Sequence, residues 1–159
     1  MPPVRLVLAD DHEIMRLGLR GLLQREANWA VVGEAADGEA AVDLVLALEP
    51  DIALLDIAMP KLNGLQAARA ILAHGSPTRI LLLSAHDSPQ VISEVLDSGA
   101  KGFVLKSEAA RDLVAAVEAV RAGQTFFTPK VAGMVLERHW KRVKKEAGKL
   151  DHASSMKKR

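Results

Sequence analysis

Five polar residues of this sequence directly follow short apolar runs. Asp10 and Asp11 follow VRLVLA, Asp56 follows DIALL, Ser84 follows RILLL and Lys106 follows GFVL. If these runs are strands of one parallel sheet, their carboxyl ends lie along a single edge, where ligands bind in open α/β sheets. The sequence therefore predicts that three carboxylates, a hydroxyl and an ammonium converge on one small site.

The expected cluster of Asp10, Asp11 and Asp56 suggests a definite chemistry. Neighbouring carboxylates repel one another, so the cluster needs a compensating positive charge. Mg²⁺ suits this role because it prefers oxygen ligands and is commonly held by a few carboxylates and several waters. Such a cation, together with Lys106, would also neutralise the charged oxygens of a phosphoryl group. These residues therefore predict a site for Mg²⁺ and phosphate.

A carboxylate can itself accept the phosphoryl group and form an aspartyl phosphate. Asp56 stands alone among apolar neighbours, whereas Asp10 and Asp11 are adjacent and together can hold a metal. We therefore expect Asp56 to be the acceptor and the adjacent pair to anchor the metal. The Ser84 hydroxyl is then placed to donate a hydrogen bond to a phosphoryl oxygen.

The elements that must position these residues alternate along the first 122 residues. Strands are expected at Val4–Ala9, Ala30–Glu34, Asp51–Leu55, Arg79–Leu83 and Gly102–Leu105. A helical pattern follows each strand; the first has an apolar face of Ile14, Leu17, Gly18 and Leu22, and the fifth covers Glu108–Ala122. Alternation of strand and helix predicts an α/β fold with a parallel sheet and helices on both faces.

Composition limits the classes of protein that fit. The chain has 159 residues, 49% of them hydrophobic and only 3% aromatic, and no cysteine. The lack of cysteine excludes a disulfide framework and thiol chemistry. The first residues lack the pattern of a signal peptide, and no apolar run approaches the roughly 18 residues of a membrane span. We therefore expect a soluble cytoplasmic protein that does not enter the membrane.

Charge divides the chain into two parts. Residues 1–129 carry a formal charge of −6, and residues 130–159 carry +7. A short helix is expected from Pro129 to about Lys145, and the last segment, residues 147–159, shows no period and is expected to be disordered or dependent on a partner. The basic segment fits a solvated, partly frayed helix or a linker, or an arm that contacts the phosphates of DNA.

Four motifs, ADDH, LLDIAMPKLNG, LLLSA and KGFVLKS, occur in this order in register with the expected strands. Over about residues 4–122 they resemble the receiver domain of response regulators in two-component signalling. The resemblance implies a flavodoxin-like, doubly wound (βα)5 sheet with the strand order 2-1-3-4-5. It places the receiver domain at residues 1–123, and a linker, short helix and basic tail at 124–159.

The resemblance also implies how the metal and the phosphoryl group are bound. A partner histidine kinase or phosphotransferase would phosphorylate Asp56. Mg²⁺ would be held directly by Asp11 and Asp56, by Asp10 through water, and by the backbone carbonyl of Ala58. Lys106 would contact the phosphate.

A switch pair is implied as well. Ser84 and Phe103 match the two positions at which the family responds to phosphorylation. The Ser84 hydroxyl would move toward the phosphate, and the ring of Phe103 would turn inward into the vacated space. The surface made by the fourth helix, fifth strand and fifth helix would change as a result.

The segments DDHEIMRLGL and AGQTFFTPKVAGMVLER resemble the subfamily whose receivers usually precede a LuxR-type helix-turn-helix. No such pattern follows here, so we expect a receiver that controls a partner or a transcriptional output, with a homodimer as one arrangement. Two alternatives stay open: a DNA-binding regulator acting through the basic tail or a missing helix-turn-helix domain, and an aspartyl-phosphate phosphohydrolase. The phosphohydrolase alternative lacks the usual general acid. Such enzymes usually carry a second Asp two residues after the nucleophile, and here Ala58 occupies that position. A receiver is not a metabolic enzyme; it catalyses only its own phosphorylation and dephosphorylation.

Overall fold

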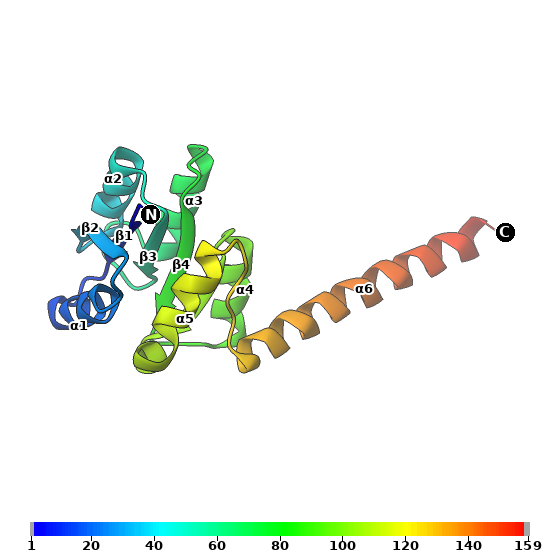
Figure 1. Cartoon of the computed structure of the whole chain (residues 1–159). Helices are drawn as coiled ribbons and strands as arrows, with labels where there is room; N and C mark the ends of the chain where they lie inside the picture. Colours follow the sequence, from blue (N-terminus) through cyan, green and yellow to red (C-terminus); the bar gives the residue numbers. More distant parts are fainter. Residues whose placement is uncertain (1, 158–159) are drawn as a thin grey trace. The chain divides into compact units, whose positions relative to one another are not determined.

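The computed structural model describes the backbone of residues 2–157 and the side chains of residues 2–148. The chain divides into two compact units, of which the first ends at Phe127 and the second begins at Thr128. The first unit contains a sheet and five α-helices, and the second contains a single helix (Figure 1). Each unit is described separately below.

A five-stranded parallel sheet forms the centre of the first unit, with the strand order β2-β1-β3-β4-β5. Its strands are β1 (Val4–Ala9), β2 (Trp29–Ala35), β3 (Ile52–Asp56), β4 (Arg79–Ser84) and β5 (Gly102–Leu105). The helices between them are α1 (Glu13–Gln24), α2 (Gly38–Leu48), α3 (Gly64–Ala73) and α4 (Pro89–Asp97). A 3-10 turn at Lys106–Glu108 leads into α5 (Ala109–Arg121). The predicted flavodoxin-like α/β fold and its strand order are confirmed.

The core explains why the strands read as continuous apolar runs. Every residue of β3 is buried, as expected for a parallel strand covered on both faces. On one face, Leu19 and Leu23 of α1 and Leu113 and Val117 of α5 belong to the same buried cluster as Leu54. Helices α2 and α3 contact each other and lie against β2 and β3, respectively. Two helical layers therefore enclose the sheet.

The predicted apolar face of α1 is wrong for Ile14, Leu17 and Gly18, whereas Leu22 is partly buried against the core as predicted. Ile14 is 87% exposed and Leu17 is 57% exposed. The helix instead contacts the core through Leu19 and Leu23, with Met15 partly buried beside them. The buried row is displaced around the helix by one position from the predicted one, because tertiary packing, and not the apolar spacing alone, selects which row meets the sheet.

The second unit also differs from expectation. Helix α6 spans Pro129–Lys157, so the predicted end near Lys145 is wrong, as is the expected disorder for residues 147–157. No proline follows Pro129, and Lys, Arg, Glu and Ala, all favourable in helices, dominate the stretch after residue 136. An i,i+4 pair between Glu137 and Lys141, 3.8 Å apart, adds a small contribution. Among the described residues, no helix is long and apolar enough to cross a membrane.

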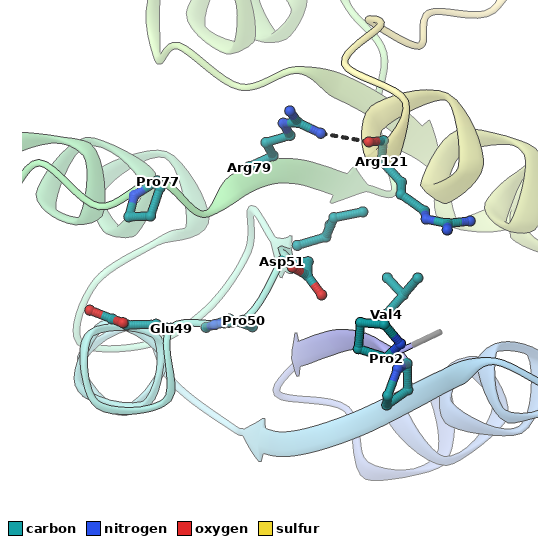
Figure 2. A pocket seen from close by; sticks show the side chains of 10 residues that line it. Pro2, Val4, Glu49, Pro50, Asp51, Pro77, Arg79 and Arg121 are labelled. Atoms are coloured by element: carbon teal, nitrogen blue, oxygen red, sulfur yellow. Dashed lines mark hydrogen bonds between the residues drawn. The ribbon is translucent and has the colours of Figure 1, made fainter.

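Near the amino ends of the strands, arginine side chains bind the backbone carbonyls at the carboxyl ends of two helices. Arg79 donates to the carbonyls of Val120 and Arg121 at the end of α5, and Arg5 donates to the carbonyl of Leu48 at the end of α2. Figure 2 shows the pocket of about 460 Å³ at this edge, with the guanidinium of Arg79 directed at Arg121. Because these cations satisfy helix carbonyls, their role here is structural.

Candidate functional site

The sheet register brings the polar residues to the opposite, carboxyl edge. Ala9 of β1 lies beside Leu55 of β3, so that the next residues, Asp10 and Asp56, are neighbours. On the other side, Ser84 pairs with Leu105. Lys106 follows Leu105 directly, in the 3-10 turn. The predicted convergence of strand-end residues therefore arises from parallel pairing.

Lys106 lies between the two inner carboxylates. Its Nζ is 2.8 Å from Asp10 Oδ2 and 2.7 Å from Asp56 Oδ2. The exposed fractions of the three side chains are 9% for Lys106, 0% for Asp10 and 1% for Asp56. One ammonium thus faces two carboxylates in a site with little solvent, which leaves a net negative charge.

The pKa values of Asp56 and Lys106 follow from this arrangement. Burial raises the pKa of Asp56 above its ordinary value of 3.8, and the negative charge of Asp10 raises it further, while the hydrogen bond from Lys106 opposes the increase. Burial acts to lower the pKa of Lys106, but contact with Asp10 and Asp56 outweighs burial, and its pKa lies above 10.5. The surroundings therefore disfavour the ionised form of Asp56 and favour the charged form of Lys106.

Asp11 is the outer member of the cluster. Its side chain is 33% exposed, and its Oδ1 lies 3.1 Å from Nδ1 of His12. His12 is the N-cap residue of α1, and its backbone N–H donates to Asp10 Oδ1 at 2.9 Å. His12 thus begins the helix, and its ring, 70% exposed, also lies against the acids.

The residues present fit a hard divalent cation. One ligand atom from each of Asp10, Asp11, His12 and Asp56 falls within 4.8 Å of all the others. Asp10 Oδ2 is fully buried and has no hydrogen-bond partner, although it is ion-paired with Lys106 Nζ at 2.8 Å. An orphaned carboxylate oxygen beside two further carboxylates matches the oxygen donors that Mg²⁺ prefers.

The loop after β3 folds tightly over Asp56. The backbone N–H of Ala58 donates to Asp56 Oδ1 at 3.2 Å. Asn63 then begins α3 with a reciprocal pair of hydrogen bonds to Gln66, a capping box. The next residue, Gly64, donates to the carbonyl of Ile57. The chain between Asp56 and α3 is thus a short loop held by hydrogen bonds at both ends.

Gly64 leaves no room for a side chain, which gives a testable expectation. A Cβ there would lie 2.3 Å from the Asp56 carbonyl oxygen, whereas a Cβ at Gly21 would meet nothing within 4 Å. We expect Gly64→Ala to lower the free energy of unfolding by about 2 kcal/mol or more. Gly21→Ala, in the middle of α1, should raise it by up to about 1 kcal/mol. Urea unfolding followed by circular dichroism measures both, and equal stability of the two variants would contradict the close approach.

The proposed switch residues lie on one face of the sheet. Ser84 is 5% exposed, and its hydroxyl oxygen accepts a hydrogen bond from the backbone N–H of His86 at 3.0 Å. Phe103 is fully buried, and it pairs with Leu82, two residues before Ser84. In this structure the ring is therefore already inside the core. Their role as a switch stays a prediction.

Three charged residues near the site escaped the sequence analysis. Arg16 of α1 donates to the carbonyl of Asp10 at 2.7 Å and lies 3.4 Å from Glu34, which also pairs with Arg20 at 2.8 Å. This network holds the start of the loop that contains Asp10 and Asp11. The network forms because Glu34 of β2 pairs with Leu8 of β1. No spacing in the sequence indicates that Glu34 lies near Arg16 and Arg20.

Comparisons with known proteins point to one family. The family model described as the response regulator receiver domain matches residues 6–118. The probable transcriptional regulatory protein NarL of Mycobacterium tuberculosis is 42% identical over 130 residues, which cover 82% of this chain and 60% of NarL. DegU of Brevibacillus brevis is 36% identical and is covered to 61%. The chain thus spans about three fifths of these relatives.

Solved structures show the same fold. A two-component response regulator of the LuxR family from Aurantimonas sp. SI85-9A1 is 36% identical, with a TM-score of 0.80 over 86% of this chain and 98% of that one. The isolated REC domain of RcsB from Salmonella enterica serovar Typhimurium, solved with the phosphomimetic BeF3−, is 30% identical, with a TM-score of 0.76 over 83% and 98%. The family model and the solved structures agree with the observed fold, and the chain belongs to the response regulator receiver domain family.

Proposed function

We propose that this protein is a phosphorylation switch in which Asp56 accepts a phosphoryl group from a histidine kinase or phosphotransferase. The supporting observation is the position of the Asp56 carboxylate, buried between Lys106 and Asp10 at the carboxyl edge of the sheet. Family membership supports the same assignment. Regulation of a partner or of transcription follows as the output, because the relatives named above include transcriptional regulators.

In the chemical step, the phosphoryl group moves from an oxygen or nitrogen atom of the donor to a carboxylate oxygen of Asp56. An Asp56 carboxylate oxygen forms a new bond to phosphorus, while the bond from phosphorus to the donor's leaving group breaks and that group keeps the electron pair. Negative charge on the phosphoryl oxygens must be held during the step. Lys106 supplies one fixed positive charge, and the N–H of Ala58 and the hydroxyl of Ser84 supply hydrogen-bond donors.

Asp10, Asp11, Asp56 and the carbonyl of Ala58 would hold Mg²⁺ in this proposal. When bound, the ion supplies positive charge that neutralises the phosphoryl oxygens and orients them. The residues of the chain do the remaining work. Lys106 opposes the rise in the pKa of Asp56, and the Arg16 guanidinium, through the Asp10 carbonyl, keeps the loop of Asp10 and Asp11 in place.

The output follows from movement of Ser84 and Phe103. The Ser84 hydroxyl now accepts from the His86 N–H. A phosphoryl group on Asp56 offers an acceptor for the proton of this hydroxyl, and movement of the side chain toward it would strain the contact with His86 and alter the loop before α4. We expect the altered surface to include α4, β5 and α5. Whole-protein activities, including DNA binding, remain proposals because the chain covers only about three fifths of its relatives.

The proposal is tested by intact-mass measurement after incubation with acetyl phosphate. With Mg²⁺, the chain should gain the mass of one phosphoryl group, and hydroxylamine, which cleaves acyl phosphates, should remove it. Removal of Mg²⁺ with a chelator should prevent the gain, because three carboxylates then repel the donor. A gain that resists hydroxylamine, or that is equally fast without Mg²⁺, would show different chemistry.

A further inference from the structure

Helix α6 presents a row of large apolar side chains to solvent. Leu136, Trp140 and Val143 are 69%, 61% and 42% exposed. Their spacing is four residues and then three, and Ala147 continues it with a further step of four. Alternating steps of four and three keep residues on one face of a helix and define the seam of a coiled coil. The row is termed the α6 seam.

The width of the α6 seam indicates what kind of surface covers it. A helix that lies on a membrane needs a broad apolar face, whereas a strict four-three row is narrow and fits a second helix. Charged or titratable residues border the α6 seam closely. Glu137 and Lys144 lie along one side, and His139 and Glu146 lie along the other. The charges of these bordering residues determine which partner helix can pair with the α6 seam.

We propose that α6 is a self-association element, in which two copies of this chain pair antiparallel through the α6 seam. In the favoured register, Trp140 lies against Val143 of the second copy, and Leu136 lies against Ala147. Each layer thus combines a larger with a smaller side chain, which fills the seam evenly. The inference is independent of the phosphorylation proposed above, because it involves only residues of α6.

Charge complementarity selects this arrangement over the alternatives. In antiparallel coiled coils, residues bordering the seam on the same side meet across the interface. In the favoured register Glu137 meets Lys144 of the second copy, and His139 meets Glu146. A shift by seven residues would place Lys144 opposite Lys144 and Glu146 opposite Glu146. Like charges in such positions are unfavourable, so they specify register and orientation.

A parallel pair lacks these contacts. There, a residue on one side of the seam meets one on the other side, five residues further along. His139 would lie opposite Lys144, and Glu137 would lie opposite Ala132. No pair of opposite charges forms within the described side chains of α6. The antiparallel arrangement is therefore the one that the described charges support.

Sedimentation velocity of the full chain over a wide concentration range is the first test. The apparent mass should rise from 17.1 kDa toward twice that value with increasing concentration. Trp140→Gln should weaken self-association by about tenfold or more, since central aromatic residues dominate such interfaces. Lys145→Gln, on the far side of the helix, introduces the same side chain and should change it little. Circular dichroism checks that helicity is unchanged.

The second test addresses orientation. Glu137→Lys should weaken association, and the double variant Glu137→Lys/Lys144→Glu should recover it, because each new charge again meets its opposite. The chain has no cysteine, so disulfides report proximity directly. A mixture of the Leu136→Cys and Ala147→Cys variants should form the mixed disulfide, whereas each variant alone should form little.

Several results would overturn the proposal. A mass of 17.1 kDa at all concentrations means that the seam does not pair with a second copy; if Trp140-dependent binding to anionic lipid vesicles accompanied it, the seam would be a membrane contact. A dimer that tolerates Trp140→Gln forms through another surface. Efficient self-disulfide formation by Leu136→Cys alone indicates a parallel pair and contradicts the orientation.

Discussion

The Asp56→Asn variant is expected to lose phosphate uptake from acetyl phosphate completely and yet to be more stable than the parent at neutral pH. An amide oxygen cannot replace the carboxylate as nucleophile, so no acyl phosphate forms. The gain in stability arises because the carboxylate is 1% exposed and burial raises its pKa. We expect an increase in the free energy of unfolding on the order of 1 kcal/mol.

The increase should depend on pH in a defined direction. The folded state of the parent holds the Asp56 proton more tightly than the unfolded state, because the folded pKa lies above 3.8. This contribution makes the parent less stable as pH rises from near 3.8 through the raised pKa. The variant lacks this titration, so its advantage should be absent at lower pH and should grow across that interval. Urea unfolding at a series of pH values measures it.

Asp43→Asn is the matched control, because Asp43 is exposed on α2 and undergoes the same chemical change. It should keep both the phosphate uptake and the stability of the parent. If Asp56→Asn were less stable than the parent at neutral pH, the ion pair with Lys106 would outweigh the cost of burial. If it still gained phosphate at the parent's rate, the acceptor assignment would be wrong.

Lys106→Met is expected to destabilise the protein and to slow its phosphorylation. Without the ammonium, Asp10 and Asp56 face each other with no fixed positive charge, although the methionine fills most of the space. Removing one partner of a buried ion pair costs up to about 3–5 kcal/mol, and we expect about 2 kcal/mol here because the carboxylates can take up protons instead. The rate of phosphate uptake should fall by about a hundredfold, as for loss of one preorganised donor.

Added Mg²⁺ distinguishes this electrostatic effect from simple loss of packing. A divalent cation can replace the missing positive charge, so it should restore part of the stability of Lys106→Met and raise its midpoint of unfolding more than that of the parent. Lys101→Met is the control, because Lys101 is exposed just before β5. It should match the parent in stability and in phosphate uptake. A Lys106→Met variant that gains nothing from Mg²⁺ would contradict the role of the acidic cluster as a metal site.

Much of the site was predictable because parallel sheets impose a simple rule. Asp10, Asp56 and Lys106 each stand at the carboxyl end of an apolar run, and parallel pairing aligns those ends whatever the details of packing. The order of the strands came from the family motifs and is confirmed. The predicted strand ends agree with the structure to within a residue or so. Strand β3, for example, ends at Asp56, one residue beyond the predicted Leu55.

Other features depended on contacts between segments far apart in the sequence. The buried face of α1 is set by Leu19 and Leu23 because they fit the sheet and α5, so exposure of Ile14 could not be deduced from helical spacing. The pairing of Arg16 with Glu34 depends on β1–β2 register. The length of α6 was underestimated because its sparse apolar residues suggested a frayed tail, although its composition favours a helix.

The sequence by itself determined the type of fold, the identity of the residues at the carboxyl edge, and the family, because each rests on local patterns of apolar runs and on residue types that follow them. Only the tertiary structure decided that Asp10 Oδ2 lacks a hydrogen-bond partner, that Lys106 contacts both inner carboxylates, and that the Phe103 ring lies in the core. These properties depend on distances between side chains of different strands. Packing and register fix such distances, and no spacing along the chain contains them.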